Sequence, residues 1–133
     1  MLVSDIMTRN PVTAAPSCTA AEASRLLHVH NIGALPVVDA AGNLRGIVTD
    51  RDIVTRCVAA DADPAVTPLR ELMTRRLSSV SPGDSLDDAA SVMAALQVRR
   101  LPVVDRGRLV GIVALADMAR SGLGEAALDG VSR

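Results

Sequence analysis

The chain contains one stretch of sequence twice. Leu-Pro-Val-Val-Asp occurs at residues 35–39 and again at 101–105, and each copy is followed by Leu-x-Gly-Ile-Val and then an aspartate. Residues 3–56 align with residues 69–121 with a single deletion in the turn that follows the first copy. Repetition of this extent indicates two copies of one structural unit. We therefore expect a ligand to lie between halves related by an approximate two-fold axis.

The composition restricts the classes of partner. With 133 residues the chain has the common size of one compact domain, so the two copies are expected to share one hydrophobic core. A net charge of -1 gives no general electrostatic reason to expect nucleic acid or an anionic membrane as a partner. The chain has no Phe, Tyr or Trp, so a planar ligand would be held between aliphatic side chains.

The sequence predicts a cytoplasmic protein with free thiols. No stretch approaches the roughly 18 apolar residues that span a bilayer, and the first residues lack the pattern of a signal peptide. Cys18 and Cys57 occupy non-equivalent positions in the two copies, and two cysteines do not make a disulfide framework in a cytosolic protein.

Each copy predicts the element order β-α-β-β-α after a helical turn. The first helix of each copy begins with a capping box, Thr19 to Glu22 and Ser85 to Asp88, in which hydroxyl and carboxylate each accept from a backbone N–H. The fold class is therefore α/β (α+β), with two tandem units packed as a pseudo-two-fold module. The other expected elements are helical turns at 4–8 and 70–74, extended pieces at 12–14 and 78–80, hairpins of 34–38 with 44–49 and of 101–104 with 109–113, and second helices at 50–58 and 115–120.

The expected boundaries follow from the repeat and from turn-forming residues. Residues 1–58 form the first unit and residues 69–121 the second. Residues 59–68, rich in Asp and Pro, are expected to be a surface linker, and the glycine-containing residues 122–133 a C-terminal tail.

The strand-to-helix junction carries the clearest chemical signal. In Gly46-Ile-Val-Thr-Asp-Arg-Asp52 a strand enters a helix whose first N–H groups favour phosphate, and Asp52 can accept from two vicinal hydroxyls, as a ribose requires. By spacing alone, Thr49 and Asp52 are equally well explained as a capping box. The second copy has Ala114 in place of the threonine and keeps Asp117, which favours a ligand-binding role for the aspartate.

On these motifs the chain resembles the CBS domain family, named after cystathionine β-synthase, and specifically the small bacterial proteins made of one tandem CBS pair, a Bateman module. The resemblance rests on Asp5-Ile-Met-Thr with Leu72-Met-Thr, on both Leu-Pro-Val-Val-Asp runs and on both Gly-Ile-Val-x-x-x-Asp runs, in family order and spacing. It implies a flattened module with two clefts that can bind an adenine nucleotide or a related adenosine compound, and it implies a homodimer.

The resemblance also implies which residues bind the ligand. Thr49 would serve phosphate and Asp52 ribose, while Arg99 and Arg100 of the other copy offer forked donors to phosphate. Without the resemblance, those two arginines are a solvated pair at a helix exit. The main nucleotide-binding site is expected to contain Ile47, Thr49, Asp52, Leu77, Ser78, Ser79, Arg99 and Arg100, and a weaker second site Val12, Thr13, Gly33, Ala34, Ile112, Ala114 and Asp117.

No metal site and no catalytic residues are expected. His28, His30 and the two cysteines show no recognised ligand spacing, and no nucleophile has a base placed by a motif. The favoured function is a non-catalytic sensor that binds AMP, ADP, ATP or S-adenosylmethionine, needs no cofactor, and acts on an unidentified regulated protein. The alternatives are a ligand-free dimerisation or docking module and, less favoured, a nucleotide hydrolase.

Overall fold

The computed structural model describes residues 1–121 of the chain and places them in two compact units. The first unit is Val12–Leu77, and the second unit combines Met1–Pro11 with the chain from Ser78 onward. The predicted tail, residues 122–133, lies outside the described residues.

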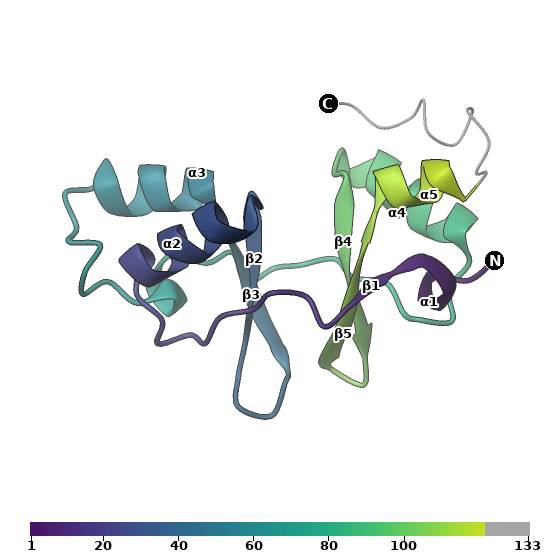
Figure 1. The fold of residues 1–133 in the computed structure, drawn as a ribbon, viewed down its shortest axis with the longest axis horizontal. Coiled ribbons are helices and arrows are strands. Elements are labelled where there is room, and N and C mark those ends of the chain that lie inside the picture. Colours follow the sequence, from purple (N-terminus) through teal and green to yellow (C-terminus); the bar gives the residue numbers. More distant parts are fainter. Residues whose placement is uncertain (122–133) are drawn as a thin grey trace. The chain divides into compact units, whose positions relative to one another are not determined.

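The first unit places two helical segments on one antiparallel hairpin (Figure 1). Its sheet consists of β2 (Ala34–Val38) and β3 (Leu44–Thr49), paired from Ala34 with Thr49 to Val38 with Leu44. The remaining elements are α2 (Ala20–His30), α3 (Asp50–Ile53), a π-helical turn (Val54–Val58) that continues α3, and a 3-10 helix (Leu69–Glu71).

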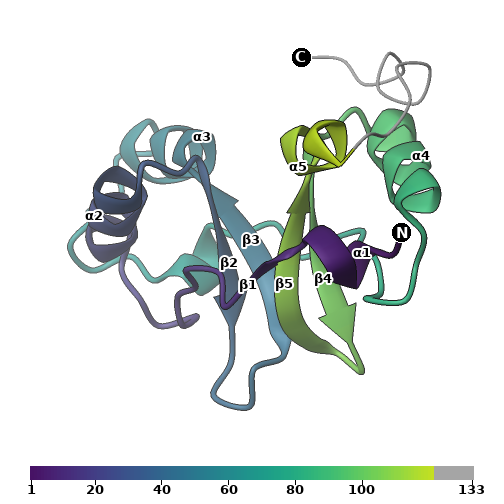
Figure 2. The same ribbon diagram turned by 45° about the vertical axis from the view of Figure 1, so that its right-hand side comes forward.

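The second unit repeats this arrangement and adds a short strand (Figure 2). Its sheet has the order β1-β5-β4, and both pairings are antiparallel, like that of the first hairpin. Strand β1 contributes only two residues. Both hairpins carry a bulge at the same place, between Val37 and Val38 and between Val103 and Val104. The elements are α1 (Val3–Ile6), β1 (Thr8–Arg9), α4 (Leu86–Leu96), β4 (Arg100–Asp105), β5 (Arg108–Ala114) and α5 (Leu115–Arg120).

The predicted single core is wrong, because the buried residues form two clusters, one in each unit. The start of each repeat packs into the unit that holds the hairpin of the other repeat. Leu69 and Met73 belong to the core of the first unit, whereas Val3 and Met7 belong to that of the second. The two sequence repeats and the two compact units are therefore different divisions of the chain.

Two glycines allow these exchanged segments to approach the hairpins. A Cβ on Gly46 would lie 2.8 Å from the Thr74 carbonyl oxygen, and one on Gly111 would lie 2.8 Å from that of Thr8. Contacts this short are forbidden to a side chain, so both positions require glycine. Next to Gly46, two backbone hydrogen bonds join the segments: Ile47 N–H donates to Thr74 O (3.0 Å), and Ile47 O accepts from Thr74 N–H (2.8 Å).

The long helices α2 and α4 both begin at the predicted cap residues, but their two caps differ in detail. The capping box of α2 is complete, with Thr19 N–H donating to Glu22 Oε1 (3.3 Å) and Glu22 N–H donating to Thr19 Oγ1 (3.2 Å). At α4, Ser85 Oγ accepts from Asp88 N–H (3.0 Å), but no return bond is found there within residues 1–121. The predicted reciprocal box is thus only half formed at α4.

Residues 59–68 are held against the start of α2. The Ala20 N–H donates to Thr67 O and the Ala21 N–H donates to Pro64 O, both at 2.9 Å. Thr67 is buried, and its hydroxyl donates to Asp63 O (2.7 Å). Although its composition is that of a linker, this segment is an ordered part of the first unit.

Candidate functional site

The junction of β3 with α3 brings Thr49 and Asp52 into direct contact. Thr49 is extended (φ -112°, ψ 166°), and its hydroxyl accepts from Asp52 N–H at 3.1 Å. The Thr49 N–H in turn donates to Asp52 Oδ2 at 3.0 Å. The capping box that the spacing allows is therefore present. The box leaves acceptor positions of the Asp52 carboxylate unused, because two carboxylate oxygens offer about four such positions.

Asp52 also has a cationic neighbour one helical turn further on. The Arg56 Nη2 lies 3.7 Å from Asp52 Oδ1, so both carboxylate oxygens of this half-buried side chain have a partner. Such i,i+4 pairs lie on the same face of a helix. The arginine reaches further than the aspartate, to Leu72 O and Thr74 Oγ1.

The residues beside this junction in the first unit are small. Ala34 is paired with Thr49 across the hairpin, and the Asp50 N–H donates to Gly33 O at 3.2 Å. The prediction places Gly33 and Ala34 in the weaker site. In the first unit they flank the Thr49 motif without contributing a charge.

The corresponding junction of the second unit has a different chemistry. Ala114 precedes α5 without a side-chain cap, and Asp117 pairs with the Arg120 guanidinium. Arg100 is paired with Ala114 across the hairpin, and the Leu115 N–H donates to Arg99 O at 2.9 Å. Both arginines are exposed. Their predicted combination with Thr49 and Asp52, which belong to the first unit, stays a prediction.

The predicted adenine contacts differ in how much of their backbone is available. Ile47 already exchanges two hydrogen bonds with Thr74, so its N–H is not available to a base, whereas its side chain is. Leu77 is half-buried at the end of the first unit, and Ser78 and Ser79 are exposed at the start of the second. In the predicted weaker site, Val12 packs against the first core, Thr13 is half-buried, and Ile112 lies opposite both Thr8 and Pro102 in the second sheet.

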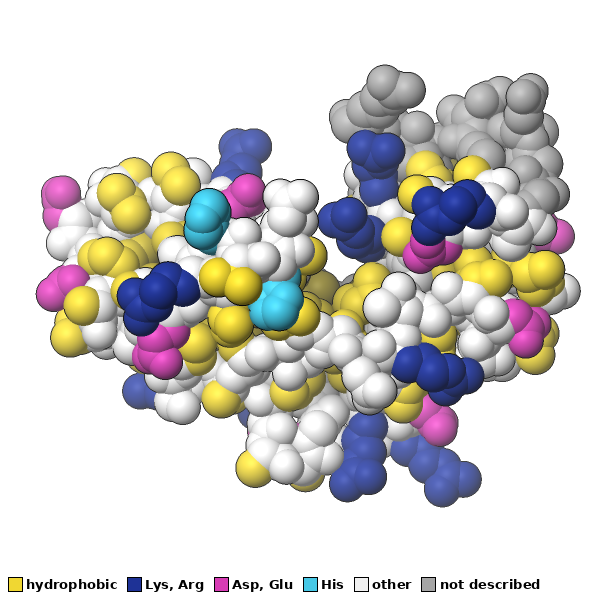
Figure 3. All heavy atoms as spheres, viewed as in Figure 1, with side chains coloured by type: hydrophobic (Ala, Val, Ile, Leu, Met, Phe, Trp, Pro, Cys, Tyr) yellow, Lys and Arg dark blue, Asp and Glu magenta, His cyan; other side chains and the backbone are white. Residues whose placement is uncertain are grey.

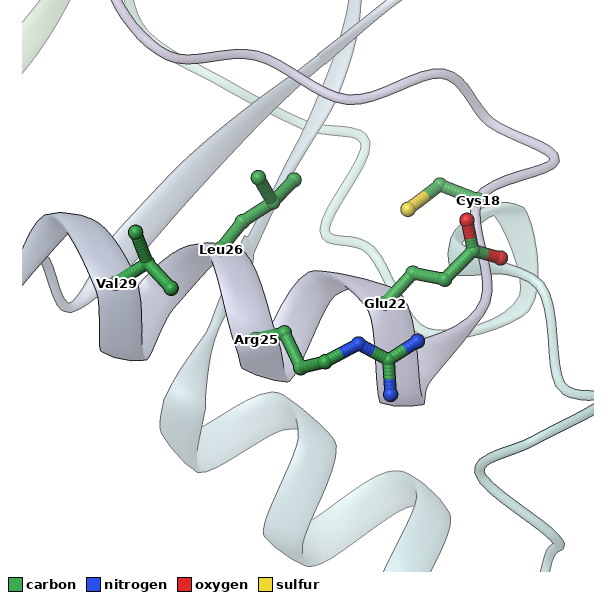
Figure 4. Close-up of a pocket in the computed structure, with 5 residues that line it drawn as sticks. All are labelled: Cys18, Glu22, Arg25, Leu26 and Val29. Carbon is green, nitrogen blue, oxygen red and sulfur yellow. The ribbon is translucent and has the colours of Figure 1, made fainter.

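Two shallow hollows lie elsewhere on the first unit, and the sequence analysis did not find them. One, of about 330 Å³, runs along α2 beside Cys18, Glu22, Arg25, Leu26 and Val29 (Figure 4). The other, of about 310 Å³, is bordered by α2 and α3. Neither contains a predicted site residue. The exposed Val29 in an otherwise polar helix end is the signal that could have indicated the first hollow.

The thiol in the first hollow has a shifted acidity. Burial raises the pKa of Cys18, the negative charge of Glu22 raises it further, and Arg25 acts in the opposite direction. A raised pKa keeps the thiol protonated near neutral pH, which makes it a poor nucleophile. Cys57 is buried in the first core, and both cysteines are free thiols.

Within residues 1–121, no three His, Cys, Asp or Glu side chains are grouped so that they could hold a metal ion. In the same range, none of the helices combines the length and the apolar character required to cross a membrane.

The sequence was compared with known families. The profile of the CBS domain matches residues 3–59 and residues 69–124. The chain belongs to the CBS domain family. This confirms the family predicted from the repeated motifs. The CBS domain-containing protein YhcV of Bacillus subtilis is 49% identical over 117 residues, which are 88% of this chain and 82% of YhcV. Hypoxic response protein 1 of Mycobacterium tuberculosis is 39% identical over 87% of this chain and 81% of that protein.

Solved structures share the fold of this CBS pair. A crystal structure of Hypoxic Response Protein I with two coordinated zinc ions is 38% identical, with a TM-score of 0.83 over 90% of this chain and 98% of that chain. The CBS domain pair of protein MJ0100, in complex with 5-methylthioadenosine and S-adenosyl-L-methionine, is 35% identical, with a TM-score of 0.78 over 91% and 94%. CBSX2 in complex with AMP is 30% identical, with a TM-score of 0.81 over 92% and 96%. These likenesses confirm the predicted class of mixed helix and sheet.

Proposed function

We propose that this CBS pair is a non-catalytic regulatory module that binds an adenine nucleotide or a related adenosine compound. The observation that carries the proposal is the β3–α3 junction, where Thr49 opens a helix and Asp52, 15% exposed, presents a carboxylate at its first turn. Two related CBS pairs support it, one solved with 5-methylthioadenosine and S-adenosyl-L-methionine and one with AMP.

The chemistry of the motif fits the two polar parts of such a ligand. The Thr49 hydroxyl accepts its capping bond from Asp52 N–H, so its own proton is available for a phosphate oxygen or another acceptor. The Asp52 carboxylate can accept from both hydroxyls of a ribose. Arg99 and Arg100 are suited to phosphate, and Ile47, Leu77, Ser78 and Ser79 would surround the adenine. This is the main site of the proposal.

A second site of the same design would be weaker. It is headed by Asp117, and Ala114 brings no hydroxyl to the junction. Its other proposed members are Val12, Thr13, Gly33, Ala34 and Ile112. Occupancy by ligand would regulate a protein partner, and the coupling is limited to the difference in ligand affinity between the two states of the module. We also propose a cytoplasmic homodimer.

Calorimetric titration tests the proposal. AMP, ADP, ATP and S-adenosylmethionine are titrated into the wild-type chain and into Asp52→Ala, Arg100→Ala and the control Asp50→Ala, which removes an exposed carboxylate of the same helix. We expect at least one of these ligands to bind the wild type and the control, and binding to be lost or strongly weakened in the other two variants. No binding by the wild type, or equal binding by all four proteins, rejects the proposal.

A ligand-free dimerisation or docking module is the second candidate. Two observations favour it. The capping box already gives Thr49 and Asp52 a structural role, and the helical segments of the first unit expose Val29, Val54 and Val58 to 73%, 57% and 56%. Hydrophobic side chains are interspersed with charged ones over this part of the surface (Figure 3). Light scattering that shows the same assembly with and without nucleotide supports this candidate, and strict nucleotide dependence rejects it.

A further inference from the structure

The Arg56 guanidinium makes three polar contacts although the side chain lies at the surface. It lies in the π-helical turn Val54–Val58, with a side chain that is 48% exposed. Its Nη1 donates to Leu72 O (2.9 Å) and to Thr74 Oγ1 (3.3 Å), and its Nη2 lies 3.7 Å from Asp52 Oδ1. The guanidinium therefore joins the motif carboxylate to a segment 16 residues further along the chain.

The segment that anchors Arg56 is itself firmly attached. Thr74 exchanges two backbone hydrogen bonds with Ile47, and Gly46 provides the space for that approach. Leu72 and Met73 are buried in the core of the first unit. The Leu72 carbonyl and the backbone of Thr74 are thus held in place, and an arginine bonded to both residues has a defined orientation of its planar fork.

We propose that Arg56 is a positioning residue that holds the Asp52 carboxylate in the orientation in which it accepts both ribose hydroxyls. The inference rests on the proposed function of the Asp52 site. Rotation of the carboxylate would break the bond from Thr49 N–H to Oδ2 or separate Oδ1 from Arg56. Two vicinal hydroxyls then meet acceptors that are already oriented, which lowers the entropic cost of binding.

The second unit shows that the contact of Arg56 with the motif aspartate, here called the brace, is not a necessary part of the fold. Ser121 stands at the position equivalent to Arg56, and its hydroxyl donates to Met118 O (2.8 Å) at the C-terminal end of α5. Asp117 pairs instead with Arg120, which comes from the position equivalent to Thr55. The same strand-to-helix junction thus forms without an arginine at the position of Arg56. The brace is a property of the Asp52 site.

The test separates orientation of the carboxylate from general support of the unit. AMP and 2′-deoxy-AMP are titrated into the full-length wild type, Arg56→Ala, Arg56→Lys and the control Arg51→Ala, which removes an exposed arginine of the same helical segment. Arg56→Ala is expected to weaken AMP about fivefold and 2′-deoxy-AMP less than about twofold, because a single hydroxyl depends less on the orientation of the carboxylate. Arg56→Lys restores the charge and is expected to recover part of the AMP affinity. Arg51→Ala should match the wild type.

Each other outcome is decisive. Equal weakening of AMP and 2′-deoxy-AMP by Arg56→Ala means general support and overturns the assignment while the proposed function stands. Unchanged AMP binding overturns it in the same way. If the wild type binds no adenosine compound, the proposed function fails and the assignment fails with it.

Discussion

The two units share a scaffold and differ at the end of the hairpin. Each has an antiparallel hairpin with the same bulge, two helical segments packed on it, and an exchanged segment that approaches a glycine. The first unit then places Thr49 before its helix and Arg56 beside its aspartate, whereas the second has Ala114 and Ser121 at the equivalent positions. Packing is thus preserved where it builds the unit, and side chains differ where a ligand would be held.

The two units also differ in where the basic residues Arg99 and Arg100 lie. Arg99 and Arg100 lie next to the junction that lacks the threonine, and Gly33 and Ala34 lie next to the junction that has it. If each unit bound ligand by itself, phosphate donors and ribose acceptor would be best combined in the second unit. The proposed main site instead requires Arg99 and Arg100 to act together with Thr49 and Asp52, and this combination stays a prediction.

The largest expected effect tests the shared scaffold. Gly46→Ala and Gly111→Ala each place a Cβ 2.8 Å from a backbone oxygen, so each should lower the free energy of unfolding by about 2 kcal/mol. Denaturant unfolding measures both. Gly83→Ala is the control, since a Cβ there meets nothing within 4 Å and should change stability by less than about 0.5 kcal/mol. A large effect at only one of Gly46 and Gly111 would contradict the equivalence of the two units.

A smaller effect is expected from the threonine that distinguishes the junctions. Thr49→Ala removes the hydroxyl that accepts from Asp52 N–H and should lower the free energy of unfolding by about 1 kcal/mol. The reverse change, Ala114→Thr, should raise it by about 0.5 kcal/mol, because Asp117 stands where Asp52 completes the box. Both are measured without ligand. Destabilisation by Ala114→Thr would show that the two junctions differ in backbone as well as in side chain.

The smallest effect concerns the turns of the two hairpins, where the first has one more residue. Asp39 Oδ1 accepts from Asn43 N–H and from Ala41 N–H, both at 3.0 Å, and the bond from Asn43 is the main cause that lowers the Asp39 pKa. Because the folded-state pKa lies below the unfolded value of about 3.9, the stabilisation is present above that pH and is lost as the pH falls through the folded-state pKa. A carboxyl NMR titration should give a midpoint for Asp39 below the ordinary value. A midpoint at or above the ordinary value would contradict the stabilisation of the Asp39 carboxylate by the longer first turn.

Local elements of the fold could be predicted from the sequence because local chemistry determines them. The expected hairpin strands at 34–38 and 44–49 agree with β2 and β3, since short apolar, valine- and isoleucine-containing runs are joined by turn-forming residues. The family could be predicted as well, because its motifs recur in order. The complete capping boxes at Thr19 and Thr49 likewise follow from spacing.

The arrangement of the repeats could not be predicted, since the alternatives look alike in the sequence. The turns at Val3–Ile6 and Leu69–Glu71 are equivalent in the repeat, so nothing local states which hairpin each one packs against. The separation of the buried residues into two cores could not be predicted for the same reason. At the site, the i,i+4 spacing of Asp52 and Arg56 was visible, but the bonds from Arg56 to Leu72 and Thr74 exist only after the exchange.

The most direct test of one strong adenosine site is a calorimetric titration of Asp52→Asn and Asp117→Asn, side by side with the wild type. Each variant keeps the shape of the side chain and removes its charge. The account predicts that Asp52→Asn weakens binding of the tightest adenosine ligand by about tenfold or more, while Asp117→Asn stays within about twofold of the wild type. Loss of tight binding in Asp117→Asn, with Asp52→Asn unchanged, would contradict it.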